Sequence, residues 1–113
     1  MASPSSLGDF EQLILLALVR LGDQAYGVSI HNEIVRRARR DVTVAAVYKT
    51  LERLELKGMA VSSLGEPTSE RGGRRKKHFR IQAAGRRALK QALASIRRMS
   101  EGLTGDPVLD LEP

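Results

Sequence analysis

The spacing of the hydrophobic residues changes after Gly58, and that change limits the folds the chain can adopt. Before Gly58, the apolar residues between positions 44 and 54 recur at helical spacing and form one stripe. After it, the segment 77–81 alternates polar and apolar residues, which is typical of a half-buried strand. The chain therefore combines helices with a small amount of β-structure.

The first helix is predicted over residues 7–21. Ser6 and Asp9 can accept hydrogen bonds at its start, and Gly22 can end it in a left-handed conformation. Its apolar residues run nearly all the way round, and a helix of that kind must be covered on every side. One face can pack on its own domain, and the other needs a second chain or a second helix.

Two further helices are predicted before Gly58. One covers about 26–39, and the next starts at Asp41 or Thr43 and ends at Lys57. Between them the chain needs only a short turn, so the two helices form a helix-turn-helix pair.

A hairpin and a last helix follow. Strands are expected over 59–64 and 77–81 around a turn-rich loop at 65–73, and a helix is expected over about 83–102. The expected order of elements is three helices, a hairpin and a last helix, which is the order of a winged helix-turn-helix. We therefore predict a mainly α fold with a small β-hairpin. The expected organisation is a disordered tail (1–6), a winged helix-turn-helix domain (7–82), a C-terminal dimerisation helix (83–102) and a flexible acidic tail (103–113).

The charge of the chain is unevenly distributed. Residues 101–113 carry four acidic side chains and no basic one, so residues 1–100 hold 19 basic and nine acidic side chains, a net charge of +10. So basic a domain attracts polyanions. Nucleic acid is the expected binding partner, and an anionic membrane is the alternative.

The helix expected before the hairpin has the features of a recognition helix. Small residues near its start let the backbone approach base edges, and polar side chains can reach bases or phosphates. The candidate DNA-contacting residues are Thr43, Ala45, Ala46, Tyr48, Lys49 and Arg53. The alternative is that Tyr48 borders the core and that Lys49 is only a solvated charge.

The hairpin loop concentrates positive charge around two glycines. Glycine lets a backbone lie close to a sugar-phosphate chain, although a run of charges can also be a solvated face. The candidate phosphate-contacting residues are Arg71, Arg74, Arg75, Lys76 and Lys77.

Residues 7–100 resemble the PadR family of transcriptional regulators. The matching segments are Tyr26-Gly27, residues 47–58, and residues 72–81 leading into Ala84-Gly85. The resemblance implies a DNA-binding homodimer, usually a repressor, in which the C-terminal helix pairs with the first helix of the partner. The resemblance also adds Tyr26 to the candidate DNA contacts. Within the family, the chain resembles the subfamily that has a short C-terminal helix. The candidate dimerisation residues are Phe10, Leu13, Leu16, Ala17, Leu89, Leu93 and Ile96.

The sequence argues against an enzyme. It has no cysteine, no Walker-type glycine loop and no metal-ligand spacing around either histidine, and His31 is interpreted as a surface residue. We expect no catalytic residue, no metal and no cofactor.

No apolar run approaches the roughly 20 residues of a membrane span, so we expect a cytoplasmic protein that binds double-stranded DNA as a homodimer and no membrane. The operator and any small-molecule effector stay unknown. Two alternatives remain, a winged-helix module that binds proteins and a binder of anionic membranes.

Overall fold

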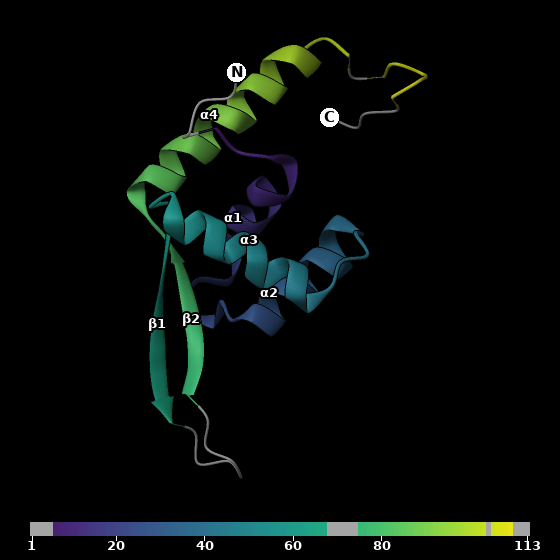
Figure 1. The fold of residues 1–113 in the computed structure, drawn as a ribbon. Helices are drawn as coiled ribbons and strands as arrows, with labels where there is room; N and C mark the ends of the chain where they lie inside the picture. Colours follow the sequence, from purple (N-terminus) through teal and green to yellow (C-terminus); the bar gives the residue numbers. More distant parts are fainter. Residues whose placement is uncertain (1–5, 68–74, 104, 110–113) are drawn as a thin grey trace.

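The structure, a computed structural model, describes residues 6–67, 75–103 and 105–109. Its helices and strands follow one another in the predicted order (Figure 1). They are α1 (Asp9–Leu21), α2 (Gly27–Glu33), α3 (Val44–Leu56), β1 (Ala60–Pro67), β2 (Arg75–Ile81) and α4 (Ala83–Ser100), with a 3-10 turn at Gly22–Gln24 and a π-helix at Ile34–Ala38.

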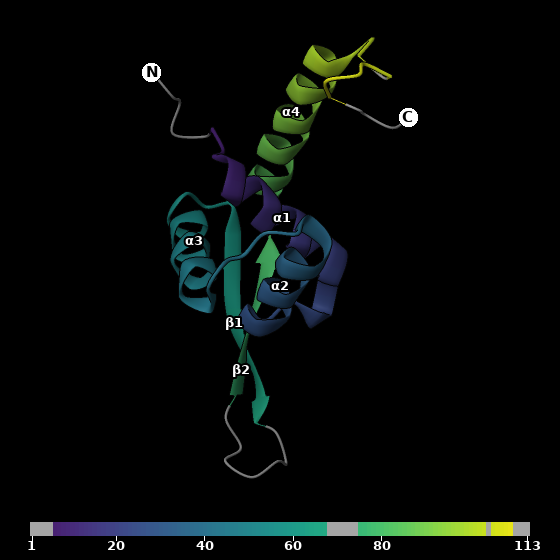
Figure 2. The same ribbon diagram turned by 90° about the vertical axis from the view of Figure 1, so that its right-hand side faces the viewer.

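The first three helices form a body from which two elements extend in opposite directions. The β1–β2 hairpin leaves one end and α4 leaves the other, as the two views show (Figures 1 and 2). The molecule is therefore elongated, with principal dimensions of 53 × 29 × 21 Å. The predicted winged helix-turn-helix with an additional C-terminal helix is confirmed.

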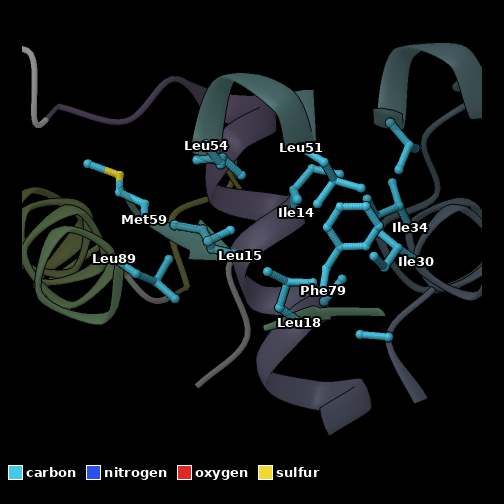
Figure 3. Close-up of a cluster of buried hydrophobic side chains, with 14 residues drawn as sticks. Ile14, Leu15, Leu18, Ile30, Ile34, Leu51, Leu54, Met59, Phe79 and Leu89 are labelled. Atoms are coloured by element: carbon cyan, nitrogen blue, oxygen red, sulfur yellow. The ribbon is translucent and has the colours of Figure 1, made fainter. Parts of the chain in front are cut away.

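The core joins every helix to the hairpin. Phe79 of β2 lies among Ile14, Ile30 and Leu51, which come from α1, α2 and α3 (Figure 3). Each of these four side chains is at most 1% exposed. One strand residue thus fixes the base of the hairpin to all three helices, because its ring fills the space between them.

Helix α1 starts two residues later than predicted. The Gly8 N–H donates a hydrogen bond of 2.8 Å to Oε1 of Glu11, so Glu11 supplies an acceptor at this end that was not predicted. At the other end Gly22 has a φ of +56° but a ψ of −121°, so its φ is positive and yet it does not adopt the left-handed helical conformation that was predicted.

The second predicted helix is divided. Helix α2 ends at Glu33 and the π-helix continues to Ala38, after which Arg39 takes a left-handed conformation with φ +56°. Helix α3 is closer to prediction, because Thr43 caps it by accepting a 3.1 Å hydrogen bond from the Ala46 N–H.

The hairpin is antiparallel, with Ser62 opposite Phe79 and Ala60 opposite Ile81. Strand β1 reaches Pro67, further than predicted, and residues 68–73, most of the loop expected over 65–73, lie outside the described residues. Helix α4 begins directly after β2, and Gly85 brings it close: a Cβ atom at Gly85 would lie 2.4 Å from the carbonyl oxygen of Met59.

Within the described ranges, no helix is both long and apolar enough to cross a bilayer.

Candidate nucleic-acid interface

The N-terminal half of α3 presents small and polar residues to solvent. Thr43, Ala45 and Lys49 are exposed, and Tyr48 is 40% exposed. The opposite side of the helix carries the apolar stripe, including Val47, which is fully buried. The amphipathic pattern therefore turns the predicted contact residues outward, with Ala46 half-buried at the boundary.

Gly27 determines where the Tyr48 ring lies. A Cβ atom on Gly27 would come within 2.2 Å of two atoms of the Tyr48 side chain, so the ring rests directly on the α2 backbone. On its other side the ring meets Phe79 edge-on, with 6.3 Å between centroids. Tyr48 is thus positioned by the first turn of α2 and by β2.

Tyr26, just before α2, contacts the hairpin. Its N–H donates a 2.9 Å hydrogen bond to Oγ of Ser29, which orients the residue. Its ring packs edge-on against His78 at 4.4 Å, and Nζ of Lys76 lies 4.9 Å from the ring centroid. A lysine over an aromatic face is attracted to it and loses some of its freedom to move.

The strand-like pairing of this segment was not predicted. The Phe79 N–H donates a 2.9 Å hydrogen bond to the Ala25 carbonyl, and Tyr26 forms an isolated bridge with His78. The pairing brings the start of α2 beside β2, although the two are more than 50 residues apart in sequence.

A hollow of about 600 Å³ forms where α2, α3 and β2 meet. It brings together four of the predicted contact residues, Tyr26, Tyr48, Lys76 and Lys77. The Nζ of Lys77 lies 5.6 Å from the Phe79 ring centroid. Cations and aromatic rings therefore share one wall, beside the exposed start of α3.

Three residues of α2 that were not predicted as contacts also line this hollow: Val28, Ser29 and Asn32. No local pattern marks them, because they join the site only through the packing of α2 against the hairpin.

The interpretation of His31 as a surface residue is incomplete. The ring is half-buried, and its Nε2 lies 2.8 Å from the Val42 carbonyl oxygen, the geometry of an N–H donor to that oxygen. His31 thereby holds α2 to the turn that precedes α3.

The remaining predicted cations are placed differently. Arg71 and Arg74 lie outside the described residues, and Arg75 is the first residue of β2. Arg53 lies near the far end of α3, where it donates to Oγ1 of Thr50 at 3.2 Å and approaches Glu11 at 3.9 Å. Its contact with DNA stays a prediction.

Glu11 ties α1 to α3 beside Arg53. Nζ of Lys57 lies 2.9 Å from both carboxylate oxygens of Glu11, whose side chain is 7% exposed. Burial acts to raise the pKa of Glu11, but the Gly8 N–H, Lys57 and Arg53 outweigh it and leave the pKa below the ordinary value of 4.5. The carboxylate thus stays ionised.

The candidate dimerisation residues differ in exposure. Ala17 and Leu89 are buried inside the chain, at 3% and 6% exposed, whereas Leu93 and Ile96 are 38% and 56% exposed on the outer half of α4. Phe10, Leu13 and Leu16 on α1 are half-buried. A role of these residues in dimerisation stays a prediction.

Among the residues that the structure describes, no group of three histidine or carboxylate side chains is arranged to hold a metal ion.

Comparison with known proteins identifies the relatives of this arrangement. The family model described as "Transcriptional regulator PadR-like family" matches residues 15–91. No curated protein matched the chain.

Several solved structures share the fold. A PadR family transcription regulator from Clostridium difficile R20291 has a TM-score of 0.67 at 20% identity, covering 83% of this chain and 94% of its own. A transcriptional regulator from Clostridium thermocellum has a TM-score of 0.67 at 24% identity, covering 86% and 88%. Part of the Aeropyrum pernix ORC1 protein, solved in complex with DNA, has a TM-score of 0.62 at 20% identity, covering 84% of this chain and 27% of its own.

Proposed function

The chain belongs to the PadR-like family of transcriptional regulators, and on that premise we propose that it is a repressor and not an enzyme. It binds a pseudo-palindromic operator as a homodimer, in the cytoplasm. Binding blocks transcription by occupying the promoter region.

One observation carries the DNA-binding part of this proposal. Tyr48 of α3 lines the same hollow as the hairpin residues Lys76 and Lys77, and Thr43 and Ala45, which precede Tyr48, are exposed. A duplex that receives α3 in its major groove would bring its sugar-phosphate backbone to the hairpin. A buried α3 start, or lysines on another face, would make this arrangement impossible.

The proposed DNA-contacting residues form two groups, one that contacts bases and one that contacts phosphates. The start of α3, from Thr43 to Lys49, reads base edges, because small side chains such as Ala45 allow close approach. Lys76 and Lys77, with the basic residues preceding them, bind phosphates and fix the register of the protein on the duplex. Tyr26 holds Lys76 in place for that contact.

The outer half of α4 supports the homodimer. Ile96 is 56% and Met99 82% exposed on a helix that extends away from its own body. A second copy would cover this apolar surface, and α1 of that copy offers half-buried Phe10 and Leu13 to receive it. The two recognition helices would then enter successive major grooves, about 34 Å apart.

Selection of bound sequences from a random duplex library tests the proposal. We expect an enriched motif with twofold symmetry and half-sites about 10 base pairs apart. Titration with duplex of random sequence at low salt separates it from the alternative of a protein-interaction module, because such a module would bind no DNA. Enrichment of a motif without twofold symmetry would contradict the homodimer but not the binding of DNA.

A further inference from the structure

Helix α3 carries an acidic residue on the face that the proposed function turns toward DNA. Tyr48, Glu52 and Leu56 are spaced four residues apart, so their side chains leave the helix on the same side. All three are exposed, as are Ala45 and Lys49 beside them. DNA phosphates repel a carboxylate, so Glu52 lowers the affinity for any duplex that offers it no hydrogen-bond donor.

No contact within the protein accounts for Glu52. The other acidic residues of α1, α2 and α3 all have side-chain partners: Asp9 pairs with Arg40, Glu11 with Lys57, Glu33 with Arg20, Arg36 and Arg37, and Glu55 with Ser62. Within the part of the chain that the structure describes, the Glu52 carboxylate makes neither a hydrogen bond nor an ion pair. Its oxygens therefore remain available to a ligand.

The hairpin contacts α3 on both sides of Glu52. One turn before it, the ring of Tyr48 meets Phe79 edge-on, with 6.3 Å between centroids. Three residues after it, Oε2 of Glu55 accepts a 3.0 Å hydrogen bond from Oγ of Ser62. Glu52 thus lies on the stretch of α3 that runs beside the hairpin, and a duplex that contacts both elements would pass over it.

The length of this exposed stripe suits the major groove. Ala45 and Glu52 are seven residues apart, which corresponds to about 10 Å along a helix. The major groove is about 12 Å wide, so both residues can lie within it at the same time. A helix placed with Ala45 and Tyr48 against the bases therefore also brings Glu52 to a base edge.

The chemistry of a carboxylate restricts the base that it can recognise. A carboxylate only accepts hydrogen bonds, and guanine and thymine present no donor in the major groove. The donors there are the amino groups of cytosine and adenine. In adenine the amino group adjoins the N7 acceptor, which repels a carboxylate, so cytosine is the base that suits Glu52 best.

We propose that Glu52 is a specificity-determining residue that accepts a hydrogen bond from the N4 amino group of one cytosine in each half-site. This hydrogen bond offsets, at the preferred base pair alone, the repulsion between Glu52 and the phosphates of every duplex. The inference rests on the DNA binding of the proposed function. It adds a residue that selects a sequence partly by weakening the binding of all the others.

Selection of bound sequences with the wild type and with Glu52→Gln tests the proposal. We expect one cytosine in each half-site of the wild-type motif, and adenine in its place in the motif of the variant. The reason is that an amide both donates and accepts and so matches N6 and N7 of adenine. For the wild type, replacing that C·G pair by T·A should weaken binding about tenfold, as measured by fluorescence anisotropy.

The affinity for duplex of random sequence gives a second measurement. Glu52→Ala removes the repulsion, so it should bind random duplex about threefold more tightly than the wild type. The same variant should bind the C·G and T·A operators equally. Asp41→Ala is the matched control, because it removes the same charge from an exposed position just before α3. It should keep the tenfold preference for the C·G operator.

The possible failures contradict different statements. A Glu52→Gln motif identical to that of the wild type would overturn the role of Glu52 and leave the proposed function intact. A motif that changes at a position where the wild type prefers a base other than cytosine would overturn the assignment of the base. A wild type that enriches no motif would instead contradict the proposed function.

Discussion

At Gly27 the backbone leaves no room for a side chain, because the Tyr48 ring occupies that space. In Gly27→Ala the ring, which is 40% exposed, can swing outward. We therefore expect little change in the free energy of unfolding, because the partly exposed ring gives way to the new methyl group. Affinity for the operator should fall about tenfold, as is usual for one lost base contact.

Fluorescence anisotropy with labelled operator measures that affinity, and urea denaturation measures the stability. In a Tyr48→Ala background, Gly27→Ala should have no further effect on affinity, because the ring it displaces is absent. Additive losses would mean that Gly27 acts on DNA in some other way.

Gly85 differs from Gly27, because the atom that an added Cβ would meet there belongs to the backbone and not to a side chain. A Cβ atom there would lie 2.4 Å from the Met59 carbonyl oxygen, which also accepts a 2.8 Å hydrogen bond from the Gln82 N–H and cannot move away freely. Gly85→Ala should lower the free energy of unfolding by about 2 kcal/mol, as overpacking does. Ser95→Ala, at an exposed position of the same helix, should leave the urea midpoint unchanged.

Among the elements, α1 and α3 are joined by an ion pair that depends on pH. The pKa of Glu11 is lowered in the folded protein, so its contribution is complete above the ordinary value of 4.5 and is lost as the pH falls through the folded value. Glu11→Gln should cost about 2 kcal/mol at pH 7. The variant should also lose less stability than the wild type between pH 5 and pH 3, because its amide does not titrate.

Urea denaturation at a series of pH values checks this prediction. Glu52→Gln is the matched control, since Glu52 is exposed on α3, and its profile should follow that of the wild type. A Glu11→Gln profile parallel to that of the wild type would show that the ion pair contributes no pH dependence.

How far the sequence predicts an element depends on whether its determinants are local. The Thr43 cap and the alternation around Phe79 are local, and α3 and the hairpin lie close to where they were expected. The π-helix after Glu33 was missed, because the apolar spacing of that segment also suits a regular helix. The hollow could be predicted only in part, since the contact of Tyr26 with Lys76 depends on the pairing of Ala25 with Phe79.

For the whole molecule, the proposed DNA complex has a measurable salt dependence. If each protomer neutralises four or five phosphates, log K should fall with log[salt] at a slope of about −7 to −9 for the dimer. Lys76→Ala with Lys77→Ala removes two such contacts per protomer, so the slope should become shallower by about 3 to 4. Operator and random duplex should both be weakened, because phosphate contacts carry no sequence information.

The control removes the same charge from the opposite end of the molecule. Arg97→Ala with Arg98→Ala changes two exposed residues near the end of α4, and the slope should stay at its wild-type value. If both variants flattened the slope equally, net charge rather than the hairpin would govern the affinity.

The anchoring of Phe79 has a consequence for how such proteins diversify. Because its side chain is held by three helices and its N–H by Ala25, the root of the hairpin cannot pivot against the body. The direction in which the wing points is therefore set independently of the residues between the two strands. Natural or designed substitutions of those residues can therefore change how far the hairpin extends and how tightly it binds DNA, without changing the direction in which it points.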